Sequence, residues 1–182
     1  MKIISGEFKG KIIKGFNIEG TRPTMDRVKE SLFGTVQNYI TDRTVLDLFA
    51  GTGNLGFEAL SNHAKYCYFN DKNIKCINFI KKTIDELNIN ERTKVLNMNY
   101  NKALEYFANN NIKFDLIFLD PPYKMEVLNE IIKEIKNKKL INKNGLIICE
   151  VDTLYLNIDY YEKIKEKKYG NKYIIIYKNN LW

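Results

Sequence analysis

An acid, two prolines and a tyrosine stand together at the end of an apolar run, in the stretch FDLIFLDPPYK, residues 114–124. The chain contains only three prolines, and two of them, Pro121 and Pro122, follow Asp120 directly. Each proline fixes its own φ and keeps the residue before it out of the helical region. We therefore expect a stiff loop that holds the carboxylate of Asp120, the carbonyl of Pro121 and the ring of Tyr123.

The exocyclic amine of a nucleobase matches this set of groups. Such an amine has two N–H donors, and the Asp120 carboxylate and the Pro121 carbonyl are two acceptors. The carboxylate also stabilises positive charge that develops on the nitrogen during alkylation, and either Asp120 or water takes the proton. Tyr123 offers a stacking face worth roughly 1–3 kcal/mol to a base that has left its stack. The plain structural alternative is a rigid turn with Tyr123 in the core.

A glycine-rich loop follows an earlier apolar run in VLDLFAGTGNLGFEAL. Gly51, Gly53 and Gly56 form G-x-G-x-x-G directly before a helical pattern, which is typical of a nucleotide-binding loop. A dinucleotide would put its pyrophosphate at the start of that helix, whereas S-adenosylmethionine would lay its methionine and ribose over the loop. Asp47, inside the apolar run, would repel a pyrophosphate and suits the ammonium group of a methionine. Its structural alternative is an acid that caps a nearby loop.

Polar residues also end the next two apolar runs. Asp71 ends YCYFND, and its two oxygens can accept both hydroxyls of a ribose in either kind of cofactor. The alternative for Asp71 is an ordinary loop acid. After the third run, Asn99 is placed to read an adenine edge and Tyr100 to pack on the ring, although a plain turn explains both residues equally well.

Apolar runs and helical patterns alternate from Thr44 onward, and this alternation determines the expected fold. The apolar spacing in IKCINFIKKTIDELNI is helical, and the continuous apolarity of FDLIFL is typical of a strand buried on both faces. The pattern predicts an α/β fold with a doubly wound, mostly parallel sheet, whose ligands bind at the carboxyl ends of the strands. The expected strands are Val45–Phe49, Tyr66–Asn70, Lys94–Met98, Asp115–Leu119 and Gly145–Val151.

The two ends of the chain predict hairpins instead. IISGEFKGKIIKGF reads as two strands around Gly6–Gly10, and KIKEKKYGNKYIIIYKNN as two strands that turn at Gly170–Asn171. The first hairpin is the candidate for a separate lobe. We therefore divide the chain into an N-terminal extension, residues 1–20, and a main domain, residues 21–182.

Positive charge is concentrated at these ends. Of the net charge of +7, residues 1–30 carry +3 and residues 160–182 carry +4, so the centre is neutral. Basic ends favour a polyanionic partner such as RNA, although a solvated face is the alternative. Six basic residues, three of them in the N-terminal extension, are candidates for phosphate contact: Lys9, Lys11, Lys14, Arg22, Arg27 and Lys29.

Several classes of protein are excluded by composition. The chain is 45% apolar and 28% charged, which argues against disorder. No apolar run approaches the roughly 18 residues that a membrane helix needs, so a cytoplasmic protein without a membrane partner is expected. One histidine and three scattered cysteines offer no metal-ligand spacing, so no metal is expected.

The motifs together resemble a known family. DPPY after an apolar strand, with AGTGNLG upstream, looks like the amino-directed class of S-adenosylmethionine-dependent methyltransferases. RPTMDRVKESLF, residues 22–33, is similar to the entry segment of the RsmD family, bacterial methyltransferases of one guanine amine in 16S rRNA. The hairpin ISGEFKGKII and the stretch KKYGNKYIIIYK also look like that family, so the resemblance covers essentially the whole chain. Thr24 or Asp26 can equally serve only to cap the helix that follows.

The resemblance implies a seven-stranded methyltransferase sheet of Rossmann-like type and an N-terminal hairpin that touches RNA. It implies that the cofactor is bound by Asp47, Gly51, Gly53 and Asp71, and that the guanine is positioned by Asp120, Pro121 and Tyr123. Family members often show two acids after the second strand, whereas this chain has Asp71-Lys72-Asn73.

The expected function is methyl transfer from S-adenosylmethionine to N2 of one guanine in 16S rRNA, without metal or covalent intermediate. The alternatives are the amine of adenine or cytosine in RNA or DNA, an NAD-dependent oxidoreductase, and a non-catalytic RNA-binding protein with a decayed methyltransferase fold. The expected substrate is the rRNA within an assembling or assembled small ribosomal subunit, and the enzyme is expected to be a monomer.

Overall fold

The computed structural model describes residues 2–13, 23–121, 125–152 and 158–181, and the side chains of 23–26 and 125–126 are outside that description. The α-helices are α1 (Pro23–Val36), α2 (Asn54–Ser61), α3 (Ile74–Leu87), α4 (Tyr100–Asn109) and α5 (Met125–Asn137), with short 3-10 turns at Gln37–Tyr39 and Asn90–Arg92. The strands are β1 (Thr44–Asp47), β2 (Tyr66–Asn70), β3 (Thr93–Leu96), β4 (Phe114–Leu119), β5 (Ile141–Val151), β6 (Glu162–Tyr169) and β7 (Lys172–Lys178).

All seven strands form one sheet in the order β3-β2-β1-β4-β5-β7-β6. The pairs from β3 to β5 are parallel, and β7 runs antiparallel to both β5 and β6. This confirms the predicted doubly wound, mostly parallel α/β sheet and the hairpin that turns at Gly170–Asn171. The strand order reverses between β1 and β4, so the loops after these two strands meet at the edge where such sheets bind ligands.

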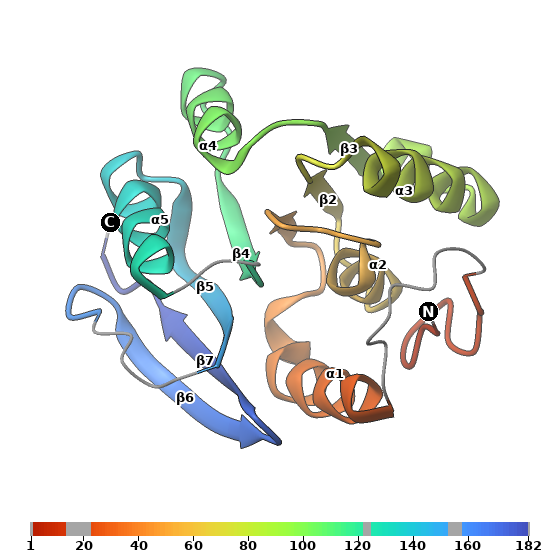
Figure 1. The fold of residues 1–182 in the computed structure, drawn as a ribbon, viewed down its shortest axis with the longest axis horizontal. Coiled ribbons are helices and arrows are strands. Elements are labelled where there is room, and N and C mark those ends of the chain that lie inside the picture. Colours follow the sequence, from red (N-terminus) through yellow and green to blue (C-terminus); the bar gives the residue numbers. More distant parts are fainter. Residues whose placement is uncertain (1, 14–22, 122–124, 153–157, 182) are drawn as a thin grey trace.

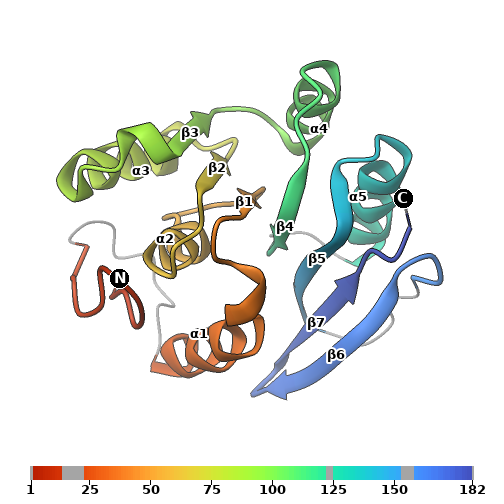
Figure 2. The ribbon, with the colours of Figure 1, turned by 180° about the vertical axis from the view of Figure 1, so that it is seen from behind.

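Helices cover both faces of the sheet (Figures 1 and 2). One apolar cluster joins the N-terminal segment, α1, α2 and α3 to alternate residues of the strands, for example Leu116 and Phe118 of β4. The other cluster joins α4 and α5 to the intervening residues, such as Ile117 and Leu119. Because strand side chains alternate between the faces, β4 is buried on both, as the continuous apolarity of FDLIFL predicted.

The N-terminal segment, residues 2–13, lies along α2 and is part of the first cluster. Ile3, Phe8 and Ile13 are buried, and the two arms meet in a single antiparallel bridge between Lys2 and Ile12. The reversal around Gly6–Gly10 is therefore closed by one bridge, where the sequence predicted two strands. The backbone of the segment forms hydrogen bonds to α2 instead; for example, the Glu7 N–H donates to the carbonyl of Ser61 at 2.7 Å. The proposed boundary at residue 20 lies outside the described residues and stays a prediction.

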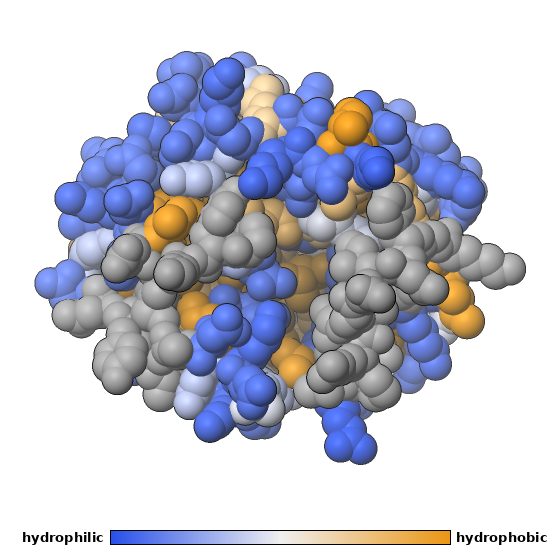
Figure 3. Space-filling model, viewed as in Figure 1, coloured by the Kyte–Doolittle hydropathy of each residue, from blue (hydrophilic) through white to orange (hydrophobic). Residues whose placement is uncertain are grey.

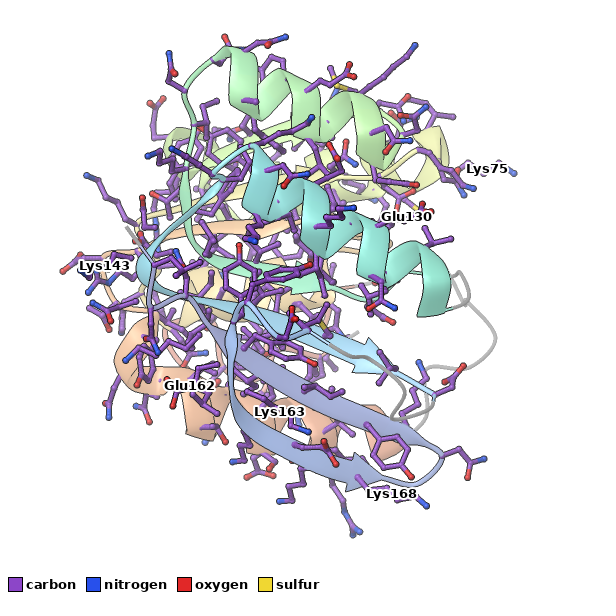
Figure 4. All side chains as sticks on the ribbon, turned by 90° about the vertical axis from the view of Figure 1, so that its left-hand side faces the viewer. Lys75, Glu130, Lys143, Glu162, Lys163 and Lys168 are labelled. Atoms are coloured by element: carbon purple, nitrogen blue, oxygen red, sulfur yellow. The ribbon has the colours of Figure 1, made fainter. Side chains whose placement is uncertain are left out.

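Strand β6 forms the outer edge of the sheet against α1. Lys165 donates to Thr35, and Lys167 and Tyr169 reach Ser31, so β6 and α1 run in opposite directions. Lys163 and Lys168 extend from the same strand (Figure 4), and lysines on an edge strand also oppose pairing with another sheet. Among the described helices, none is long and apolar enough to cross a membrane.

Candidate active site

The glycine loop joins β1 to α2 at the carboxyl edge of the sheet. Gly51 and Gly53 have φ values of 54° and 78°, in the left-handed region that glycine adopts without strain. A Cβ on Gly51 would meet nothing within 4 Å, whereas a Cβ on Gly56 would lie 2.2 Å from the Phe69 ring. The first glycine therefore leaves open space above the loop, and the last one lets α2 approach β2 closely.

Asp47 ends β1 with its carboxylate under the start of α2. Its Oδ2 accepts the backbone N–H of Gly56 at 3.0 Å, and the residue is 3% exposed. Burial raises the pKa of Asp47 to about 7 against the opposing Gly56 hydrogen bond, and the nearby acids Asp120 and Asp71 raise it further. The other oxygen, Oδ1, accepts no hydrogen bond from the residues that the structure describes. A buried carboxylate of this kind favours a cationic ligand, because a cation stabilises its ionised form.

Asp71 follows β2 and ties three loops together. Its Oδ2 accepts the N–H of Gly51 at 2.8 Å, and its Oδ1 accepts the N–H of Asn73 at 2.8 Å. Asn97, after β3, donates to the Asp71 carbonyl at 2.8 Å. The carboxylate thus lies against the glycine loop, where ribose binding was predicted, and each oxygen keeps lone pairs for further donors.

Asn70 is a structural residue of this edge that the sequence did not single out. Its Nδ2 donates to the carbonyls of Leu48 and Met98, both at 3.1 Å, and so links the loops after β1, β2 and β3. It is 1% exposed, and within the described part of the chain its Oδ1 has no hydrogen-bond partner. An asparagine at the end of an otherwise apolar strand was the available signal.

Asn99 and Tyr100 lie where α4 begins. Asn99 is the N-cap and its Oδ1 accepts from the nitrogen of Lys102 at 3.0 Å, so the simple turn interpretation has a direct structural basis. The Tyr100 ring packs on Phe49 with centroids 5.9 Å apart, beside the loop that follows β1. An adenine contact for either residue stays a prediction.

Asp120 follows β4 and lies next to the loop after β1. Asp47 pairs with Phe118 across the two strands, so Asp120 lies two positions beyond that pair on the same face of the sheet. The residue is half-buried, and its carboxylate accepts no hydrogen bond from the residues that the structure describes. Burial raises the pKa of Asp120 to about 6, Glu150 adds to the rise, and Lys172 opposes it. Asp120 is thus an acceptor available to a ligand.

Glu150 and Lys172 were missed by the sequence analysis. Leu119 of β4 pairs with Cys149 of β5, so Asp120 and Glu150 occupy neighbouring positions at the ends of parallel strands. Lys172, the first residue of β7, donates to Oε1 of Glu150. Nothing in the local sequence marks this pair, because the β5–β7 register brings it to the site.

The rest of the predicted loop is only partly described. Pro121 is half-buried, while Pro122 and Tyr123 lie outside the described residues. The roles assigned to the Pro121 carbonyl and the Tyr123 ring therefore stay predictions.

The structure separates the predicted RNA-contacting residues into three groups. Lys14 and Arg22 lie outside the described residues. Lys9, Lys11 and Arg27 are exposed; Lys9 belongs to the turn that lies beside the C-terminal end of α2, away from the glycine loop. Contacts between α1 and β6 run antiparallel, so the exposed Arg27, one turn before Ser31, lies towards the β6–β7 turn.

Lys29 corrects the prediction. It is 3% exposed, lies 3.6 Å from Glu58, and donates to the Lys2 carbonyl at 2.7 Å and to Asn54 at 3.0 Å. A buried lysine with these partners cannot reach a phosphate, so we assign Lys29 to the core of the protein. The sequence around Lys29 is basic and gives no sign of this role, because the role depends on Glu58 in another helix.

The donors and acceptors at this edge fit S-adenosylmethionine. A buried carboxylate suits an ammonium group, a second one follows β2 where a ribose would lie, and the glycine loop leaves open space. Among the described residues, no group of three or more His, Cys, Asp or Glu side chains could hold a metal ion. Apolar side chains are visible in the middle of the face drawn in Figure 3, among hydrophilic ones.

Comparisons with known proteins agree on one kind of relative. A family model described as Conserved hypothetical protein 95 matches residues 1–178. Ribosomal RNA small subunit methyltransferase D of Haemophilus influenzae is 35% identical over 184 residues, covering 98% of this chain and 94% of that protein. The Escherichia coli protein of the same name is 31% identical, over 82% of this chain and 74% of its own length.

Solved structures give the same result. The chain is similar to yhhF of Escherichia coli, a provisionally assigned methyltransferase, with a TM-score of 0.86, 25% identity, and coverage of 100% of this chain and 99% of that one. It is also similar to the provisionally assigned methylase HI0767 of Haemophilus influenzae, with a TM-score of 0.79, 31% identity, and coverage of 98% and 97%.

Proposed function

Because this chain belongs to the RsmD family, represented by the matching family model and the small-subunit methyltransferases D, we propose that it methylates N2 of one guanine in 16S rRNA. The methyl donor is S-adenosylmethionine. The methyltransferase activity and the small-subunit rRNA follow from relatives that are more than 30% identical over most of their length. The choice of guanine and of its N2 atom is our own assignment.

One observation supports an amine of a base as the methyl acceptor. At the carboxyl edge of the sheet, the carboxylates of Asp47 and Asp71 each accept a backbone N–H of the glycine loop. Asp120 accepts none from the described residues, although it lies at the same edge. The first two carboxylates are therefore placed to hold a cofactor, and the third is free to accept hydrogens of a substrate amine.

S-adenosylmethionine, when bound, supplies an electrophilic methyl group on a sulfonium ion. Asp120 and the Pro121 carbonyl accept the two amine hydrogens and so fix the direction of the nitrogen lone pair. The Asp120 carboxylate also stabilises positive charge on that nitrogen, and it can accept the proton because its pKa of about 6 leaves it mostly ionised at neutral pH. The Tyr123 ring stacks on the base.

The form of the substrate is a further part of the proposal. The base must leave its stack to reach the site. The described basic residues outside the core, such as Lys9, Lys11 and Arg27, can contact phosphates but offer little surface for reading a sequence. We therefore assign the assembling or assembled small subunit as the particle that presents the base, and a cytoplasmic monomer as the working form of the enzyme.

The test is mass spectrometry of nuclease-digested rRNA from cells with and without the gene. Loss of one N2-methylguanosine, restored by wild-type protein and not by Asp120→Ala, supports the proposal. Loss of a methylated adenosine or cytidine instead would assign the other base. Restoration of N2-methylguanosine by Asp120→Ala at the wild-type rate would refute the active-site assignment.

A further inference from the structure

Five charged residues lie on the same face of the sheet at its carboxyl edge. One face of the sheet packs on α1 and α2, and every second residue of a strand points to it. Phe118 of β4, Ile148 of β5 and Ile174 of β7 are examples. Because strand side chains alternate with a period of two, the same count along β1, β2, β4, β5 and β7 puts a charged residue on this face at each strand end. These residues are Asp47, Asp71, Asp120, Glu150 and Lys172. The first two contact the glycine loop, so the other three remain for the substrate.

These three residues follow the strand order β4, β5 and β7. Asp120 and Glu150 come directly after the paired residues Leu119 and Cys149. Lys172 lies diagonally across from Glu150, because Glu150 pairs with Ile174. The row therefore presents an acceptor, a second acceptor and a donor, in that order.

Each member of the row keeps capacity for a ligand. Lys172 contacts Oε1 of Glu150, and Oε2 accepts no hydrogen bond from the residues that the structure describes. The Lys172 ammonium has three donors, and its side chain is 51% exposed, against 17% for Glu150. The ion pair thus orients both groups and leaves an oxygen and N–H groups available.

The Watson–Crick edge of guanine has the complementary order. Beside the N2 amine lies N1–H, a donor, and beyond it O6, an acceptor. Adenine and cytosine instead place an unprotonated ring nitrogen next to their amine, and that nitrogen would face the carboxylate of Glu150 without a hydrogen between them. Two acceptors that face each other cannot form a hydrogen bond, so both are desolvated without a partner. A site of this kind discriminates strongly against the base that causes this loss.

Resting on the proposed function, we propose that Glu150 and Lys172 select guanine. Glu150 Oε2 accepts N1–H of the target base, Lys172 donates to O6, and Asp120 accepts from the N2 amine. Glu150 and Lys172 are thus specificity-determining residues at the substrate. No bond to the base is formed or broken at these two positions.

The first test measures kcat/KM on small subunits purified from cells that lack the gene. Glu150→Ala should lower it roughly 10- to 100-fold, as expected for loss of a hydrogen bond to a charged group, and Lys172→Met about tenfold. Glu134→Ala removes a 2.7 Å ion pair between Glu134 of α5 and Lys138, the residue that follows this helix, and should stay within about twofold. Glu150→Gln provides a second, conservative variant in case the alanine variant folds poorly.

The second test changes the base. 2-Aminopurine keeps the exocyclic amine but lacks N1–H and O6, and it is placed at the mapped position of ligated rRNA reconstituted into particles. Wild-type enzyme should react roughly 100-fold more slowly with it than with guanine, whereas Glu150→Ala should keep only the roughly tenfold that the lost contact between Lys172 and O6 costs. A merely structural role for Glu150 would lower both rates and leave their ratio unchanged.

The outcomes separate the two proposals. If wild-type protein forms no N2-methylguanosine, the proposed function fails. If wild-type protein forms it and Glu150→Ala retains the wild-type kcat/KM or the wild-type discrimination against 2-aminopurine, only the selection of guanine by this pair is overturned. The selection of guanine would also be overturned if Glu150→Ala binds the cofactor more weakly, or has a lower Tm, to an extent that accounts for its lower rate.

Discussion

The ionisation of Asp47 should control the affinity for the cofactor between pH 6 and 7.5. Burial raises the pKa of Asp47 to about 7, with the Gly56 hydrogen bond in opposition and Asp120 and Asp71 adding to the rise. With this pKa, the carboxyl is ionised in about one molecule in eleven at pH 6 and in about three of four at pH 7.5. If only the ionised form accepts the ammonium group, Kd should be about eightfold higher at pH 6.

Calorimetry with S-adenosylmethionine and with S-adenosylhomocysteine is the direct assay. Both ligands carry the ammonium group, and only the first carries the sulfonium charge. The effect of Asp47 on Kd should therefore be the same for both ligands, whereas an effect of Asp120 on Kd should differ between them. Binding at pH 6 should also release protons, which appear as a dependence of the measured enthalpy on the ionisation enthalpy of the buffer. Asp47→Asn keeps an acceptor for Gly56 and should give weaker, pH-independent binding.

The same shift predicts an effect on stability without ligand. An acid whose pKa is raised on folding, here from 3.8 to about 7, binds more protons in the folded state between these values. The free energy of unfolding therefore falls as pH rises from about 4 to about 7, and Asp47→Asn should raise Tm at pH 8 and leave it unchanged at pH 4. Equal Kd values at pH 6 and 7.5, or a Tm at pH 8 that the substitution lowers, would refute this account of Asp47.

Three further predictions concern other parts of the molecule. For Asp120, kcat/KM on small subunits should decline below about pH 6 with loss of one ionised group, since burial, reinforced by Glu150, raises its pKa to about 6; a flat acid limb would contradict its role. Gly56→Ala should lower the free energy of unfolding by about 1–3 kcal/mol in urea titrations, because the new Cβ would lie 2.2 Å from the Phe69 ring; an unchanged midpoint would show that the ring yields. Lys29→Ala should cost about 3–5 kcal/mol, because it leaves the buried carboxylate of Glu58 without a cation. Lys11→Ala should instead leave Tm unchanged and lower the salt dependence of RNA binding; the reverse pattern would contradict the assignment of both lysines.

The placement of residues that lie within one local sequence motif was predictable. FDLIFL, the glycine loop and Asp47 each depend on a strand and the turn that follows it, and local periodicity and glycine chemistry report on such units. The distance along the chain between Asp47 and Asp120 did not matter, because parallel strands bring their carboxyl ends to one edge whatever separates them.

Contacts that depend on register or on burial by another element were not predictable. Glu150 reaches the site only because β5 aligns with β4 one position before it, and Lys172 only because β7 runs back along β5. Lys29 read as one of several surface lysines, since its partner Glu58 lies in a different helix. A glutamate between Phe57 and Ala59 in an apolar helix was the one sign of a buried charge that sequence reasoning could have used.

Glu58 also joins the described N-terminal segment, residues 2–13, to the rest of the protein. It is 0% exposed and lies on α2, the helix that begins at the glycine loop. Its carboxylate accepts the backbone N–H groups of Ile4 and Ser5 at 2.8–3.2 Å and lies 3.6 Å from Lys29 of α1. An unpaired buried carboxylate is costly, so the segment, α1 and α2 are held as one unit.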